Sequence, residues 1–222
     1  MNLIIEIDGP VLDVAPLWYR LHREVAAAVG WSALDQATFW GLTRKQGREA
    51  RLLPGAKPLK LKKYHARFDE RLEADEILEG HEPHETIDRV LASLSTKGSL
   101  SLVTLGSNVP ARRAVLERYN LLRFADRIEG LDADPRRRPS ELRTLADDDK
   151  RSLVAAASDS LVRAAAEAGI LAVGVPRGPC SPERLYRAGA DIVYKDLESL
   201  RAAIVEGSEE LTRAGLLPPA LG

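Results

Sequence analysis

The stretch Leu3-Ile4-Ile5-Glu6-Ile7-Asp8-Gly9-Pro10-Val11-Leu12-Asp13 carries the strongest structural signal in the sequence. Residues 3–7 form a short apolar run that only Glu6 interrupts, which is typical of a buried strand. The next three residues, Asp8-Gly9-Pro10, all favour turns. We therefore expect a buried strand over residues 3–7, followed by a sharp turn, with the carboxylates of Glu6 and Asp8 close to the strand end.

The rest of the chain alternates between strand-like and helix-like patterns. Strand character recurs at residues 100–105, 153–157, 170–175 and 191–194. Helical spacing of apolar residues is found at 14–29, 87–94, 110–119, 181–188 and 197–205, and an Ala-rich helix that ends at Gly169 follows the strand at 153–157. Strands that alternate with helices of about ten residues indicate βαβ units, in which a parallel sheet carries helices on both faces. The sequence therefore predicts an α/β fold, with a loosely packed tail at 207–222.

Composition sets limits on the class of protein. The 222 residues are 45% hydrophobic and 29% charged, the balance of a globular chain, and the size predicts one compact unit that could carry a small inserted lobe. A net charge of −1 provides no overall attraction to nucleic acid or to a membrane surface. A single cysteine, Cys180, excludes an internal disulfide, and no apolar stretch approaches the roughly 20 residues that span a bilayer. We expect a cytoplasmic protein without a membrane segment.

One segment departs from this neutral balance. Residues 41–72 contain ten Lys and Arg side chains against three Asp and Glu, a local charge of +7. The basic residues are Arg44, Lys45, Arg48, Arg51, Lys57, Lys60, Lys62, Lys63, Arg67 and Arg71. The segment could therefore attract anions, although a lysine-rich helix face is often only solvated.

In the order of its elements the chain resembles the haloacid dehalogenase-like (HAD) hydrolases, in particular the phosphoglycolate phosphatase-like subgroup. Residues 3–13 look like the opening strand and turn of that family, usually written hhhhDxDGTLxD. Residues 39–44 resemble its cap segment, 102–104 its second motif, and 164–169, 178–185 and 189–193 its C-terminal part. The resemblance implies a Rossmann-like core over 1–13 and 83–206, a helical cap inserted after the first strand over 14–82, and a C-terminal tail over 207–222.

The resemblance also implies a phosphatase site at the carboxyl ends of the strands. In that family an aspartate after the first strand attacks phosphorus, and a second aspartate two residues later acts as acid and base. By position these residues are Glu6 and Asp8. Thr104 and Arg138 stand at the phosphate-binding positions. Mg²⁺ is the implied cofactor of an active site, with Glu6, Asp8 and Asp159 as its candidate ligands.

Several of these positions depart from the family pattern. Glu6 replaces an aspartate, and its added methylene moves the carboxylate by about a bond length, while a 1 Å misplacement can cost about a hundredfold in rate. Counting back from Gly169 places Ala157 and Leu161 where the family has its later acids. A shift of two residues would bring Asp159 into the first of these positions, but it would place Arg163 at the second.

Three functional hypotheses follow. The first is a HAD-like protein with a degraded acid and metal set, weak or inactive as a hydrolase, that binds a small phosphorylated or anionic ligand or a protein partner without a cofactor. The second is an active Mg²⁺-dependent phosphomonoesterase that acts on a small phosphorylated metabolite through a variant site. The third treats residues 41–72 as a nucleic-acid surface, which is disfavoured because stacking aromatics are limited to Phe39, Trp40, Tyr64 and Phe68. Pairing of two copies stays open.

Two spatial expectations accompany these hypotheses. Glu6, Asp8, Thr104 and Asp159 should all lie at the carboxyl edge of one sheet. The cap should place some of Arg44, Lys45, Arg48 and Arg51 toward a cleft at that edge.

Overall fold

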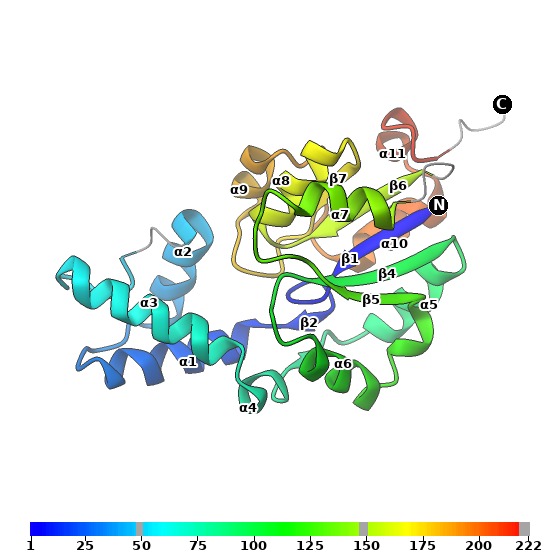
Figure 1. The fold of residues 1–222 in the computed structure, drawn as a ribbon. Helices are drawn as coiled ribbons and strands as arrows, with labels where there is room; N and C mark the ends of the chain where they lie inside the picture. The colour runs from blue at the N-terminus through cyan, green and yellow to red at the C-terminus, as the bar shows by residue number, and fades with distance from the viewer. Residues whose placement is uncertain (48–50, 147–150, 218–222) are drawn as a thin grey trace.

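The computed structural model describes residues 1–47, 51–146 and 151–217 and contains a six-stranded parallel sheet (Figure 1). The strand order is β5-β4-β1-β6-β7-β8, with β1 near the centre. The strands are β1 (Asn2–Glu6), β4 (Ser99–Thr104), β5 (Arg127–Gly130), β6 (Ser152–Ala156), β7 (Leu171–Gly174) and β8 (Ile192–Val193). All five neighbouring pairs are parallel. The predicted α/β class is confirmed.

Helices cover both faces of this sheet. One apolar cluster joins Leu3 and Ile5 of β1 to α5 (Ile87–Ser95), α6 (Val109–Arg118) and α10 (Leu197–Glu206). A second cluster joins Ile4, from the opposite face of the same strand, to α7 (Arg138–Leu145), α8 (Asp159–Ala168) and α9 (Pro182–Ala188). Successive side chains of a strand point to opposite faces, so the continuous apolar run of β1 serves both clusters.

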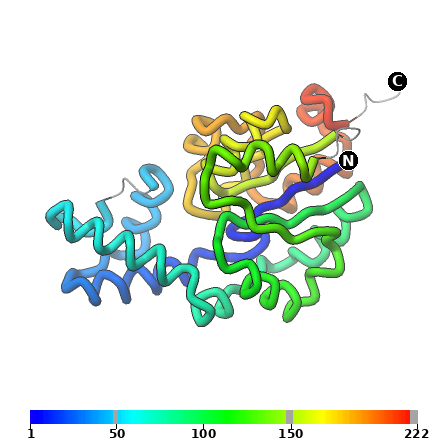
Figure 2. The backbone as a smooth tube through the Cα atoms, in the orientation of Figure 1, coloured from blue at the N-terminus to red at the C-terminus, as the bar shows by residue number. Residues whose placement is uncertain are grey.

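A helical lobe lies beside the sheet (Figure 2). It consists of α1 (Ala15–Ala28), α2 (Gln36–Gln46) and α3 (Pro58–Leu72), followed by the short α4 (Asp75–Leu78). The chain enters the lobe through β2 (Leu12–Asp13) and returns through β3 (Glu82–Pro83), which pair antiparallel. The lobe has its own apolar cluster, with Phe39 and Tyr64 fully buried. Its core is thus separate from the two clusters on the sheet.

The end of the chain differs from the sequence prediction. A loosely packed tail was expected from residue 207, yet residues 209–213 form α11 (Glu209–Arg213), which is capped by Ser208: its hydroxyl accepts a hydrogen bond from the Leu211 N–H. Leu211 and Leu216 are buried in the cluster that contains β1. The prediction is wrong for residues 208–217 because these leucines cover apolar surface on the sheet unit. Residues 218–222 lie outside the described part of the chain.

Two further elements, β5 and α7, were not predicted. Arg127, Glu129 and Gly130 are exposed, so this edge strand has no apolar run that would mark it in the sequence. In the described residues no helix is both long enough and apolar enough to cross a membrane.

Shortening a leucine of the C-terminal segment should destabilise the whole sheet unit. Leu211→Ala should lower the free energy of unfolding by about 2–5 kcal/mol, since it removes a fully buried side chain and leaves a cavity. Urea denaturation followed by circular dichroism measures the loss. Leu59→Ala is the control, because Leu59 is 66% exposed and its removal should change stability by less than about 0.5 kcal/mol. Equal losses in the two variants would contradict the packing of α11.

Candidate functional site

The predicted site residues gather at the carboxyl ends of the central strands. Glu6 ends β1, Thr104 ends β4, and Asp159 begins α8 three residues after β6. Asp8 lies in the turn after β1, where Gly9 has a φ of +108°, a conformation that glycine adopts without strain. The expected edge and the expected sharp turn are therefore both present.

Glu6 is enclosed beneath the turn that follows β6. It is 4% exposed, and its Oε2 accepts hydrogen bonds from the backbone N–H groups of Ala157 (2.7 Å) and Ser158 (2.9 Å). The pKa of Glu6 is raised from 4.5 to about 7, because burial and the nearby charge of Asp8 disfavour the ionised form more than the hydrogen bonds from Ser158 and Ala157 favour it. Glu6, which the sequence resemblance aligns with the family's nucleophile, thus connects the end of β1 to the turn after β6.

Asp8 is one end of a three-residue ionic bridge. Its Oδ2 accepts hydrogen bonds from the Thr104 hydroxyl (2.7 Å) and from Nε of Arg112 (2.8 Å). The two terminal nitrogens of Arg112 donate to the carboxylate of Glu73, at 2.9 and 3.0 Å. Because Glu73 directly follows α3, the bridge connects the sheet edge to the helical lobe.

Arg112 is the most deeply buried residue of the bridge. The side chain of Arg112 is 6% exposed, against 19% for Asp8 and 29% for Glu73. Burial alone would raise the pKa of Glu73, but the hydrogen bonds from Arg112 and the Asn108 N–H hold it below its usual value. The pKa of Arg112 is raised: burial opposes its charge, but the two carboxylates outweigh this effect. Asp8 is therefore engaged as the ion-pair partner of a permanently charged guanidinium.

The two candidate phosphate-binding groups already have protein partners. Thr104 is fully buried, and its Oγ1 accepts from the Gly106 N–H (3.0 Å) while donating to Asp8. Arg138 is 8% exposed and donates to the carbonyl oxygens of Asp132 (2.8 Å) and Ala133 (3.1 Å), and to the Ser160 hydroxyl. The guanidinium of Arg138 fastens the loop before α7 to the start of α8.

Asp159, the third candidate metal ligand, is paired with an arginine. Its Oδ2 accepts from Nε (3.0 Å) and Nη2 (2.6 Å) of Arg184, whose Nη1 also donates to the carbonyl of Thr43 in α2 (3.3 Å). This arginine is a second connection between the sheet unit and the helical lobe.

Ala157 and Leu161, which the sequence resemblance aligns with two acids of the family, are completely buried. A Cβ atom built on Gly9 would lie 2.8 Å from the Ala157 Cβ, and one built on Gly178 would lie 2.9 Å from it. Three chain segments therefore meet at the Ala157 methyl group, and a longer side chain there would have to displace backbone. Leu161 belongs to the apolar cluster under α8.

These arrangements do not fit a magnesium site. Mg²⁺ is bound by carboxylates and phosphate oxygens in near-ideal octahedral geometry. Glu6, Asp8 and Asp159 instead face backbone N–H groups, Arg112 and Arg184, respectively. Within residues 1–47, 51–146 and 151–217, no group of three or more His, Cys, Asp and Glu side chains could hold a metal ion.

Sequence reasoning did not identify Arg112, Glu73 and Arg184. One signal was available for Arg112, which lies in the first turn of α6, since helical side chains tilt toward the N-terminus and hence toward the end of β4. Glu73 and Arg184 gave no signal, because their partners are 39 and 25 residues away in the sequence.

A basic cavity lies where the helical lobe meets the sheet unit. Its volume is about 530 Å³. Arg44 and Lys45 of α2 and Arg177 and Lys195 of the sheet unit line it, and Asp13 is the single acidic residue among its described lining residues. The other lining residues are Ala15, Gly41, Pro176, Cys180, Ser181 and Pro182.

The predicted basic cleft is therefore present in part, but the candidate catalytic and phosphate-binding residues do not line it. Arg44 and Lys45 line the cavity as expected. Arg51 is exposed and is not a lining residue, and Arg48 lies outside the described residues. Glu6, Asp8, Thr104, Arg138 and Asp159 contribute nothing to the lining.

No protein-family model matches the chain, and no curated protein sequence matches it. Solved structures do match. A haloacid dehalogenase-like family hydrolase from Streptococcus pneumoniae superposes with a TM-score of 0.72 at 14% identity, covering 91% of this chain and 97% of that one. A predicted phosphatase from Clostridium acetobutylicum gives 0.68 at 18% identity, over 92% and 98%. A HAD family hydrolase from Deinococcus radiodurans, solved with bound phosphate and sodium, gives 0.65 at 21% identity, over 99% and 98%.

The chain therefore has the fold of the HAD hydrolases, and the resemblance noted in the sequence is confirmed at the level of fold. More particularly, its structural neighbours include a predicted phosphoglycolate phosphatase from Haemophilus somnus. The fold by itself does not specify a reaction.

The buried carboxyl group of Glu6 should make stability depend on pH. In the unfolded chain Glu6 ionises near its ordinary value of 4.5, whereas in the folded chain it ionises near 7. The unfolded state thus loses this proton first, so the free energy of unfolding should fall by about 3 kcal/mol as pH rises from 4.5 to 7 and level off above 7.

Glu6→Gln should remove this part of the pH dependence. The glutamine carbonyl can still accept both backbone N–H bonds, but glutamine does not ionise. The stability of the variant relative to the wild type should therefore increase as pH rises from 5 to 8. Urea titrations across that range measure the difference, with exposed Glu70→Gln as the control. A difference between Glu6→Gln and wild type that does not change with pH would show that Glu6 titrates normally.

Removing the central cation of the ionic bridge should be costly. Arg112→Ala should lower the free energy of unfolding by about 3–5 kcal/mol, because Asp8 and Glu73 would lose the charge that offsets their burial. The adjacent Arg113→Ala should cost less than about 1 kcal/mol, since Arg113 is 55% exposed and only approaches Glu117 at 3.5 Å. Chemical denaturation of both variants provides the comparison, and equal effects would refute a structural role for the bridge.

Proposed function

We propose that this protein uses a phosphatase fold to bind a small phosphorylated or otherwise anionic ligand and does not catalyse Mg²⁺-dependent phosphate hydrolysis. One observation carries the proposal: the three acids that the family resemblance marks for chemistry are each held by partners within the chain. Glu6 is bound to backbone N–H groups, Asp8 to Arg112, and Asp159 to Arg184.

The physical reasons concern both attack and proton transfer. A nucleophile must reach its target atom with errors well below 1 Å, and Glu6 is buried with one oxygen already holding two donors. A general acid or base must reach the leaving group or a water molecule, and both carboxylate oxygens of Asp8 already accept hydrogen bonds from Arg112 or Thr104. Neither residue is thus prepared for the role that its position implies.

The basic cavity supports the ligand-binding part of the proposal. Four cationic side chains and one acidic side chain line it, so its local field attracts anions even though the whole chain is nearly neutral. Arginine can hold a phosphate with two parallel hydrogen bonds, and lysine adds a point charge. A volume of about 530 Å³ is within the usual range for small-molecule sites. A cytoplasmic location remains our prediction from the sequence.

The hydrolase part is tested with an aryl phosphate substrate, with and without Mg²⁺. We expect no turnover above background that a chelator abolishes, and no difference between the wild type and Glu6→Ala. Robust, chelator-sensitive hydrolysis that Glu6→Ala abolishes would instead establish the alternative hypothesis of an active phosphomonoesterase.

The binding part is tested by calorimetric titration with pyrophosphate. The double variant Lys45→Glu/Lys195→Glu should weaken binding at least tenfold, because it reverses two of the four positive charges. Arg187→Glu makes the same type of change on an exposed face of α9 that does not line the cavity, and it should retain affinity. Equal affinity of the wild type and both variants for pyrophosphate would show that the anion does not bind in the basic cavity.

A further inference from the structure

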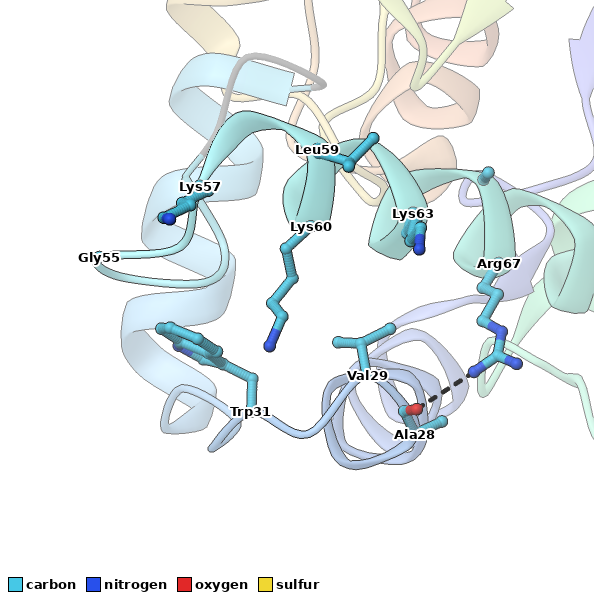
Figure 3. A pocket seen from close by; sticks show the side chains of 10 residues that line it. Ala28, Val29, Trp31, Gly55, Lys57, Leu59, Lys60, Lys63 and Arg67 are labelled. Carbon is cyan, nitrogen blue, oxygen red and sulfur yellow. Dashed lines mark hydrogen bonds between the residues drawn. The ribbon is translucent and has the colours of Figure 1, made fainter.

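The helical lobe carries a second, larger cavity on its own surface, between the end of α1 and the length of α3 (Figure 3). Its volume is about 920 Å³. The lining residues are Ala28, Val29, Trp31, Gly55, Lys57, Leu59, Lys60, Lys63, Ala66 and Arg67, and we call this set the lobe groove. It shares no residue with the basic cavity described above.

Several of the residues that line the lobe groove are apolar. Val29 and Trp31 are half-buried, and Leu59 is 66% exposed, more than any other large hydrophobic residue in the described part of the chain. Leu59 is not needed for the core of the lobe, because α3 inserts Tyr64 and Phe68 there from another face. An exposed leucine among the lining residues indicates a surface that gains free energy when it is covered.

The sides of the lobe groove are positively charged. Lys57, Lys60, Lys63 and Arg67 all line it, and none of its described lining residues is acidic. Lys60, Lys63 and Arg67 follow one face of α3, so their Cα atoms span about 10 Å along the helix axis.

Two contacts hold the side chains of Lys60 and Arg67 over the groove. The Lys60 ammonium lies 4.7 Å from the centre of the Trp31 ring, toward which it extends in Figure 3. Arg67 donates a hydrogen bond to the Ala28 carbonyl (3.2 Å) across the groove. The charge is therefore positioned beside the apolar lining residues.

We propose that the lobe groove docks an acidic segment of a partner protein that also carries apolar side chains. The acidic side chains would face Lys57, Lys60, Lys63 and Arg67, and the apolar ones would cover Leu59 and Trp31. Charge complementarity and the apolar lining residues together select such a segment. A single-stranded nucleic acid fits less well, because bases stack on several aromatic rings and Trp31 is the only aromatic residue among those that line the groove.

Fluorescence anisotropy with a labelled 15-residue peptide tests this proposal. The probe alternates glutamate pairs with leucine, and two matched peptides replace every leucine by serine or every glutamate by lysine. The probe should bind with micromolar affinity, and both matched peptides should bind at least tenfold more weakly. Binding that ignores the leucines would reduce the groove to a nonspecific charge effect and overturn the proposal.

Variants of the protein locate the contact. Lys60→Glu/Lys63→Glu and Leu59→Ser should each weaken binding of the probe at least tenfold. Lys62→Glu is the matched control, since Lys62 is an exposed lysine of the same helix that does not line the groove, and it should bind as the wild type does. All altered side chains are surface residues, and circular dichroism verifies that each variant is folded.

Three other outcomes would overturn the proposal. Preferential binding of a single-stranded oligonucleotide, with the same dependence on Lys60 and Lys63, would identify a nucleic-acid surface. Preferential binding of vesicles rich in anionic lipid would identify a membrane surface. Sedimentation that shows a dimer which Leu59→Ser dissociates would show that a second copy covers the groove. Pyrophosphate binding at the basic cavity should be unchanged in Lys60→Glu/Lys63→Glu, so this test fails or succeeds independently of the proposed ligand site.

Discussion

The ion pairs of the buried Arg112 guanidinium are the interaction on which the placement of the helical lobe against the sheet depends. It holds Asp8, from the turn after the central strand, and Glu73, from the end of the helical lobe's longest helix, on opposite sides of one planar group. A charge in this position is stable only while both carboxylates are present, since an unpaired buried ion is costly. The sheet edge and the lobe are therefore electrostatically coupled through one side chain.

The same principle extends around the sheet edge. Arg184 connects Asp159 to the backbone of α2, and the Ala157 methyl group fills the space where Gly9 and Gly178 approach. The polar groups that the sequence resemblance aligns with a phosphatase site thus satisfy one another, and tight packing excludes a longer side chain at residue 157. These contacts occupy the edge where open parallel sheets usually place their reactive groups.

Positive charge is available elsewhere on the molecule. Arg44, Lys45, Arg177 and Lys195 face the cavity between lobe and sheet unit, while Lys57, Lys60, Lys63 and Arg67 face the groove on the lobe. Because long cationic side chains keep their charge near water while their stems cover apolar surface, such residues form binding surfaces without disturbing a core. The two proposed binding regions differ in chemistry: each is lined by four cationic side chains, but only the groove on the lobe also has an exposed leucine and a tryptophan among its lining residues.

The sequence by itself determined the parallel sheet, because β1, β4, β6 and β7 are apolar runs whose periodicity and flanking turns are local properties. It also placed Glu6, Asp8, Thr104 and Asp159 at one edge, since every parallel strand ends there. Only the tertiary structure decided what these side chains do. Glu6 meets backbone donors 151 and 152 residues away, and Asp8 meets an arginine 104 residues away. Similarly, Leu211 resembled a tail residue until the sheet unit provided the apolar surface that buries it. Pairings over such separations depend on which elements pack together, and local sequence patterns carry no information about that choice.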